Sequence, residues 1–217
     1  MKILVINPNT TCAMTELVVQ QLSLYLPRAT VVESMTATAG SSVIASRESF
    51  DAAASTSLSM VMQAIKNKIY FDAVLLGCFG DPGLETMRKK VAHPIIGLAW
   101  ASMHKAEMMK RPYAVVTAGM PWRDILTQQF KAWGASDLFL GVEILSLTGL
   151  QILNDPINSL PAVLKAITDA RSLGAHNIIL GGAVFAGYKN LMDQQGHATQ
   201  GLIDCAQASA SALCDLN

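Results

Sequence analysis

Short apolar runs alternate with longer segments of helical periodicity along the whole chain. The runs are rich in β-branched residues and end at glycine or polar turn residues, which predicts strands at about 2–7, 30–35, 73–77, 94–98, 113–117, 141–147 and 177–181. Between and after them we expect helices at about 11–26, 48–67, 83–91, 99–110, 121–133, 159–173, 186–195 and 198–214. This alternation is typical of βαβ units, so we predict an α/β fold built on mostly parallel sheet.

An internal duplication divides this pattern into two halves. The two runs that end at Cys78 and Gly182 are both polar-led apolar strands, and each is the third strand of its half. We therefore predict two similar lobes, residues 1–100 and 101–217, each a mostly parallel sheet flanked by helices and related by pseudo-two-fold symmetry, with the C-terminal helix free to cross over. Ligands bind beyond the carboxyl ends of parallel strands, so an active site is expected in the cleft between the lobes.

The charge balance favours a small-molecule partner over nucleic acid or an acidic membrane, because sixteen basic and sixteen acidic residues give a formal net charge of zero. Apolar stretches are broken before the ~18 residues that span a bilayer. The N-terminus opens on an apolar strand and not on a signal peptide, so we expect a cytoplasmic protein. The four cysteines lack Cys-x-x-Cys spacing, so neither a metal site nor a disulfide framework is predicted.

Cys78 is the first candidate for chemistry. It follows a buried strand and opens a glycine-punctuated turn that leads into a predicted helix. Such a turn exposes backbone N–H groups and brings the positive end of a helix near the sulfur, which favours thiolate and binds carboxylate or enolate oxygens. The alternative is a small buried residue that only ends a strand, since buried free cysteine is common.

Asn9 and Thr10 are the second candidates, because they lie in the turn after the first predicted strand. Their amides and hydroxyl, with the following helix N-terminus, are suited to holding an anionic substrate. A plain Asx turn with a helix cap remains the alternative.

Five motifs carry a family resemblance: Ile6-Asn7-Pro8-Asn9-Thr10, Ala39-Gly40, Gly77-Cys78-Phe79-Gly80-Asp81-Pro82-Gly83, Pro94-Ile-Ile-Gly97-Leu-Ala99 and Val115-Val116-Thr117. Together they resemble the hydantoin and allantoin racemase branch of the aspartate/glutamate racemase superfamily, and the resemblance runs over nearly the whole chain. The resemblance implies a homo-oligomeric enzyme without pyridoxal or metal, in which two cysteines face opposite sides of the substrate's α-carbon. Cys78 matches the first cysteine. Substrate-holding positions of the family match Asn9, Thr10, Phe79, Gly80, Thr117 and Ala183.

The chain departs from this family pattern at Gly182, which stands where the second cysteine is expected. Glycine has no titratable group, so two-thiol proton exchange is lost at this position. Three explanations stay open: a relative with one-sided chemistry, a racemase with a different second acid, or a variant with impaired activity. Cys205, His104 and His197 are the possible substitutes for the acid. Trp100 also replaces a glutamate that is frequent in the family.

The leading hypothesis from the sequence is a cofactor-independent racemase of amino-acid or hydantoin type. Cys78 would transfer a proton at a carbon next to a carboxylate or imide carbonyl, where preorganised donors must stabilise the developing oxyanion. The alternatives are a one-thiol decarboxylase, similar to arylmalonate decarboxylases, and a ligand-binding relative without turnover. The sequence leaves open the substrate and the number of subunits.

Overall fold

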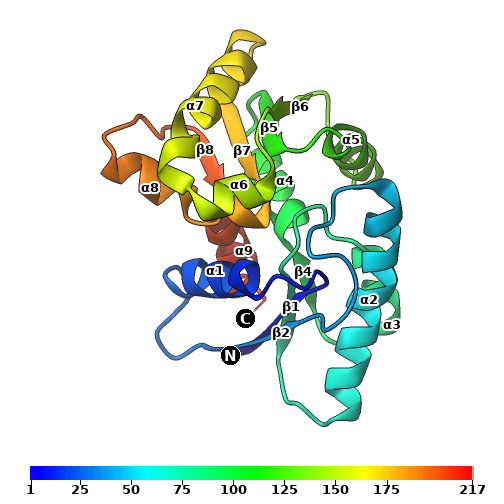
Figure 1. The fold of residues 1–217 in the computed structure, drawn as a ribbon. Helices are drawn as coiled ribbons and strands as arrows, with labels where there is room; N and C mark the ends of the chain where they lie inside the picture. The colour runs from blue at the N-terminus through cyan, green and yellow to red at the C-terminus, as the bar shows by residue number, and fades with distance from the viewer. Residues whose placement is uncertain (217) are drawn as a thin grey trace.

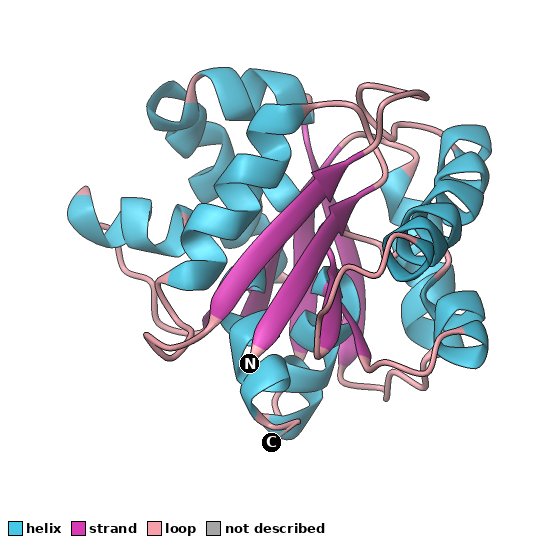
Figure 2. Cartoon of the chain, turned by 90° about the horizontal axis from the view of Figure 1, so that it is seen from below, coloured by secondary structure: helices cyan, strands magenta, loops and turns pink. Residues whose placement is uncertain are grey.

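The computed structural model describes residues 1–216, which form two four-stranded parallel sheets with helices on their faces (Figures 1 and 2). The first sheet has the order β2-β1-β3-β4 and the second has the order β6-β5-β7-β8. The same order therefore occurs twice with an offset of four strands, which confirms the predicted α/β fold of two similar lobes. The strands are β1 Lys2–Asn7, β2 Val31–Thr36, β3 Ala73–Leu76, β4 Ile95–Gly97, β5 Tyr113–Ala118, β6 Phe139–Leu145, β7 Asn177–Gly181 and β8 Leu202–Asp204.

The helices follow the strands in alternation, as the apolar periodicity predicts. Their bounds are α1 Cys12–Ser23, α2 Arg47–Lys66, α3 Leu84–Lys90, α4 Leu98–Met108, α5 Trp122–Ala132, α6 Gly149–Asn154, α7 Pro156–Ser172, α8 Tyr188–Gln194 and α9 Cys205–Cys214, with a 3-10 turn at Ala183–Phe185. Two predicted helix starts differ from the structure by three residues or more. The predicted helix 198–214 is wrong over its first part, because β8 precedes α9. The helix predicted from 159 begins three residues earlier, at Pro156.

The helices α4 and α9 join the two lobes. The helix α4 follows the first sheet but packs on β7 and β8 of the second, while α9 follows the second sheet and packs on β4 and α1 of the first. Figure 1 shows α9, in red, beside the blue α1. The largest apolar cluster accordingly includes residues of both sheets, such as Val5 of β1 and Val115 of β5. This shared core fixes the positions of the strand ends that form the candidate site.

Candidate active site

A cavity of about 300 Å³ lies where the carboxyl ends of both sheets meet. The first lobe lines it with residues from the turns after β1 and β3 and from the loop before α2; the second lobe lines it from the turns after β5, β6 and β7. This is where parallel sheets bind ligands. Of the residues expected at the site, six line the cavity: Asn9, Cys78, Phe79, Thr117, Gly182 and Ala183.

The other two expected residues, Thr10 and Gly80, do not line the cavity. Thr10 lies just behind it, and its backbone N–H donates to Ser41 O at 3.1 Å, which ties the first turn to the loop before α2. Gly80 is covered by the ring of Trp122, which comes within 2.5 Å of the position that a Cβ at Gly80 would take. Both residues therefore shape the walls without facing the hollow.

Cys78 is held at the start of a double turn. The backbone N–H of Asp81 donates to Cys78 O at 3.0 Å, and the N–H of Leu84 donates to Asp81 O at 3.1 Å. Each turn has a glycine with positive φ at its third position, Gly80 at 99° and Gly83 at 83°, which is a requirement of this turn geometry. Cys78 lines the cavity, although the residue is only 5% exposed.

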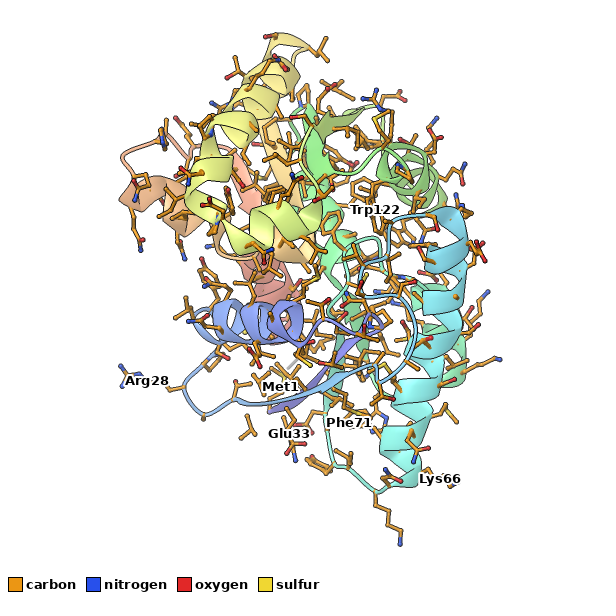
Figure 3. All side chains as sticks on the ribbon, viewed as in Figure 1. Met1, Arg28, Glu33, Lys66, Phe71 and Trp122 are labelled. Carbon is orange, nitrogen blue, oxygen red and sulfur yellow. The ribbon has the colours of Figure 1, made fainter. Side chains whose placement is uncertain are left out.

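The second lobe holds this turn from the other side. The Phe79 ring lies over Gly181 at the end of β7, where an added Cβ would be 2.9 Å from the ring. In the opposite direction, Trp122 of α5 packs on Gly80, and Gln129 Nε2 donates to Gly80 O at 3.4 Å. Figure 3 labels Trp122 near the N-terminal end of α2. The thiol thus belongs to a segment that both lobes restrain.

Burial and a neighbouring carboxylate determine the resting state of the thiol. Desolvation is the larger cause that raises the pKa of Cys78, and the negative charge of Asp81 adds to it. We expected the helix end after the turn to favour the thiolate. In the structure burial outweighs that effect, so the neutral thiol is the resting form and it can donate a proton.

Asn9 and Thr117 supply neutral polar groups to the cavity. Asn9 Oδ1 accepts hydrogen bonds from Asn7 Nδ2 at 3.1 Å and from the Thr11 backbone N–H at 2.9 Å. Its Nδ2 has only the weak acceptor Met14 Sδ at 3.7 Å, so this amide can still donate to a ligand. Thr117, at the end of β5, adds a hydroxyl. These donors are suited to a carbonyl oxygen or to the enolate that forms from it.

Gly182 lies in the second lobe at the place equivalent to Cys78. Its φ of 154° and ψ of 143° are strained for a residue with a side chain, and an added Cβ would meet Phe185 Cδ2 at 3.1 Å. Its carbonyl accepts a weak hydrogen bond from Cys205 Sγ at 3.6 Å. The backbone at this position is therefore that of a glycine, and the turn is not shaped for a second thiol.

None of the three possible substitutes for the second acid lines the cavity. Cys205 is fully buried in α9 beneath Gly182 O. His104 is exposed on α4 and stacks on Trp100, with ring centroids 5.1 Å apart. His197 follows α8, and its N–H donates to Met192 O. Trp100 is absent from the cavity wall as well, since Arg88 covers its ring at 4.3 Å.

An apolar wall was missed by the sequence analysis. It comes from both lobes and consists of Met14, Val43, Ile44, Trp122, Leu150, Val184 and Phe185. Trp122 follows the carboxyl end of β5, and Leu150 follows β6 through the capping box of Thr148 and Gln151. The rule that parallel sheets bind ligands at strand ends would have pointed to both segments. Nothing in the local sequence indicates that Ile44 crosses to the same cavity.

No metal site or membrane span is found in the described part of the chain. Within residues 1–216, no three His, Cys, Asp or Glu side chains are grouped so that they could hold a metal ion. Over the same residues, no helix has the length and apolar character needed to cross a bilayer.

The chain is similar to known proteins over nearly its full length. The sequence profile of the family described as Asp/Glu/Hydantoin racemase matches residues 3–213. Hydantoin racemase from Paenarthrobacter aurescens is 27% identical over 219 residues, which cover 100% of this chain and 92% of that protein. Allantoin racemase from Klebsiella pneumoniae superposes with a TM-score of 0.88 at 25% identity, covering 100% of this chain and 87% of that one. For allantoin racemase from Pseudomonas fluorescens the TM-score is 0.89 at 24% identity, with 100% and 90% covered.

Proposed function

We propose that this chain, which belongs to the Asp/Glu/hydantoin racemase family and is an isomerase of the racemase type, uses Cys78 to move a proton at the carbon next to a carbonyl of a hydantoin-like ring. The observation that carries the proposal is that Cys78 lines a cavity where the two sheets meet, with neutral donors nearby. We further propose that the two lobes divide near residue 100. No pyridoxal or metal is needed for this chemistry.

The cavity wall supports an uncharged substrate. None of the lining residues carries a formal charge at neutral pH, and most are apolar. A dicarboxylate such as aspartate or glutamate would bring charges that these residues cannot pair, and burying an unpaired charge is costly. A hydantoin ring carries amide-like groups that Asn9 and Thr117 can bind, while an apolar substituent can pack on Trp122 and Ile44.

The proton steps follow from the side chains present. Cys78 rests as the neutral thiol, so it must first lose its proton to water. The thiolate then removes the α-proton, and Asn9, Thr117 and backbone amides stabilise the enolate oxygen. The Cys78 thiol exchanges this proton with water and then protonates the same face of the enolate. The opposite face meets Gly182, which has no acid, so the proton that inverts the centre comes from water. The chain should therefore exchange the α-hydrogen faster than it inverts the centre.

Deuterated water provides the test. An enantiomerically pure 5-substituted hydantoin is incubated with the protein, and incorporation of deuterium and loss of optical rotation are followed together. We expect exchange with retention to exceed inversion, and Cys78→Ser to lower both rates on the order of 10³-fold. A panel with allantoin, aspartate, glutamate and an aryl malonate tests the substrate class. Release of carbon dioxide from the malonate, with no label in unreacted hydantoin, would favour the one-thiol decarboxylase. Binding without turnover of any compound would contradict an enzymatic role.

We also propose that the protein acts in the cytoplasm as a homo-oligomer. The four cysteines Cys12, Cys78, Cys205 and Cys214 are all free thiols, as expected in a reducing compartment. Several large apolar side chains are exposed on the isolated chain, including Leu173 at 68% and Met120 at 69%. Light scattering at several protein concentrations would measure the mass in solution, and a monomer throughout would contradict the proposal.

A further inference from the structure

Asp81 is a buried acid that the proposed proton transfer does not use. It is fully buried beside Cys78 and does not line the cavity. Its φ of 55° is left-handed; among residues 1–216 the other non-glycine residues with positive φ, Lys68 and Lys110, lie on the surface. Burying a carboxylate and placing an aspartate at positive φ both cost free energy, so the contacts of this carboxylate must offset that cost.

The carboxylate of Asp81 caps a helix that begins 17 residues later in the chain. Asp81 Oδ1 accepts from the Ala99 backbone N–H at 3.1 Å, and Oδ2 accepts from that of Trp100 at 2.7 Å. These amides belong to the first turn of α4, whose own N-cap residue, Gly97, has no side chain to bind them. The Cys78 turn is therefore fastened to the helix that joins the two lobes.

Gly97 leaves the space that this contact needs. Its φ of −114° and ψ of 150° are open to any residue, so backbone conformation does not require a glycine here. A Cβ added to Gly97 would overlap the carboxylate of Asp81. The glycine and the aspartate are thus complementary parts of one contact between strand end and turn.

The second lobe makes the same connection in the opposite direction. Asp204 is equivalent to Gly97, because Gly97 pairs with Leu76 in the first sheet and Asp204 pairs with Leu180 in the second. Asp204 caps α9 from its own N-cap position through the amides of Ala206 and Gln207, and its Oδ2 reaches back to the Gly187 N–H at 2.7 Å. The last residue of β8 thus carries a carboxylate that the last residue of β4 could also carry.

We propose that Asp81 is a positioning residue for the reaction: by capping α4 from the turn that carries Cys78, its carboxylate holds the sulfur where the proton is transferred. This proposal rests on the proposed function, because the proton transfer that Asp81 would support is the one proposed there. The carboxylate has a second effect, because its negative charge opposes ionisation of the thiol. Removing it should therefore lower turnover and, at the same time, ease thiolate formation.

The charged surroundings of Asp81 are few. Burial is the largest influence and raises the pKa of its carboxyl to about 7, against the amide hydrogen bonds of Trp100 and Ala99. Arg88 of α3 adds a positive charge that lowers this pKa. Cys78 of the same turn and Cys205 of α9 are the thiols on which the Asp81 charge acts. Neutralising Asp81 therefore changes the electrostatics of the thiols directly.

The test uses the full-length chain with four variants. Asp81→Asn is nearly isosteric and uncharged, and Asp81→Gly suits the left-handed backbone. The double variant Asp81→Gly with Gly97→Asp moves the carboxylate to the position that Asp204 occupies in the second lobe. Asp155→Ala is the matched control, because Asp155 caps α7 through Asn158 N–H away from the cavity. Two quantities are measured: kcat and KM with a hydantoin, and the pH midpoint of Cys78 alkylation by iodoacetamide, followed on the Cys78 peptide by mass spectrometry.

We expect Asp81→Asn and Asp81→Gly to lower kcat by up to about 100-fold with little change in KM, since small displacements of a reacting group have effects of that order. The alkylation midpoint should move to lower pH in both. The double variant should regain turnover and a higher midpoint, and Asp155→Ala should lose thermal stability only. Unchanged kcat and midpoint in Asp81→Asn, or a folded double variant no better than Asp81→Gly, would overturn the proposal. If the parent protein turns over no hydantoin, the proposed function fails, whereas the alkylation midpoints still decide whether Asp81 controls the thiol.

Discussion

The turns after β3 and β7 occupy the same position in their lobes, but they begin with different residues and differ in turn type. Both follow the third strand of a lobe, and both end in a left-handed glycine that precedes a short helix, Gly83 at φ 83° and Gly187 at φ 78°. The first begins with Cys78 and is a double turn. The second begins with Gly182 and forms a 3-10 turn. The two lobes therefore place a turn at the same position, and only the turn of the first lobe begins with a thiol at that position.

The direction of helix capping shows the same asymmetry. In the first lobe, Asp81 of the turn after β3 accepts hydrogen bonds from amides at the start of α4, the helix after the next strand. In the second lobe, Asp204 at the N-cap of α9 accepts one from the Gly187 amide in the turn after β7. Both arrangements bury one carboxylate between a turn and a helix N-terminus. In the first lobe alone, this carboxylate lies on the same turn as a thiol.

Removal of the thiol gives the largest expected difference between the two turns. Cys78→Ser should lower turnover on the order of 10³-fold, because a hydroxyl is a far weaker acid than a thiol, so it donates a proton poorly and almost never ionises to act as the base. Circular dichroism and thermal unfolding should show an intact fold. The control is Cys214→Ser, whose thiol is partly exposed at the end of α9 and away from the cavity. Equal turnover in both variants would remove Cys78 from the mechanism.

The next largest effect tests the contact between Asp81 and Gly97, which belongs to the capping arrangement of the first lobe. Gly97→Ala places a methyl group against the Asp81 carboxylate, so we expect a loss of about 3 kcal/mol in the free energy of unfolding, as for other overpacked sites. Urea unfolding measures it. Gly149→Ala is the control, because the nearest atom to its added Cβ, Val184 Cγ1, is at an ordinary 3.8 Å.

A double-mutant cycle assigns the cost of Gly97→Ala to its cause. Combined with Asp81→Ala, the substitution should cost less than the sum of the two single changes, because the overlapping carboxylate is gone. Strict additivity would show that Gly97 and Asp81 do not share the space as described.

A smaller effect is expected from pH. The folded-state pKa of Asp81 is raised to about 7, above its value in the unfolded chain, so the folded state binds the proton more tightly. Its contribution to stability is therefore complete below the unfolded pKa and is lost as the pH rises through 7. Between about pH 5 and pH 8 we expect a decrease of about 2 kcal/mol in the free energy of unfolding.

Asp81→Asn tests the origin of this decrease. The pKa of Asp204 is raised in the same direction, again mainly by burial, so the variant should flatten the profile only in part. Asp72 and Asp155 have lowered pKa values and act in the opposite sense, but both are exposed to solvent. A profile as steep in the variant as in the parent would show that Asp81 is not the titrating group.

Sequence reasoning succeeded where the signal is local and repeated. The apolar runs that form β1, β3, β5 and β7 are fully buried central strands, so their positions and the equivalence of Cys78 and Gly182 could be predicted. The strand β8 was missed because it holds only two apolar residues, Leu202 and Ile203, and runs directly into the helical segment of α9. The helix α6 was missed because a capping box starts it and an aspartate ends it within six residues.

The site was predictable only in part for a different reason. The residues that stand at strand ends, such as Asn9 and Thr117, could be found from their place in the chain. Trp122 and Ile44 form one wall only after the lobes pack together, and the bond from Asp81 to the amides of α4 joins residues that local patterns do not connect. Tertiary contacts of this kind leave no signal at the level of sequence spacing.

The smallest expected effect concerns the turn that lacks the thiol. Gly182→Cys forces a side chain onto a backbone with φ of 154° and against Phe185, which should cost about 1 kcal/mol in the free energy of unfolding. Gly182→Ala is the control and should cost the same without adding an acid. With a thiol opposite Cys78, the cysteine variant should narrow the gap between deuterium exchange and inversion, because the far face now has its own proton donor. If cysteine and alanine give the same ratio of exchange to inversion, position 182 does not face the substrate, and the equivalence of the two turns would be one of fold without any bearing on the reaction.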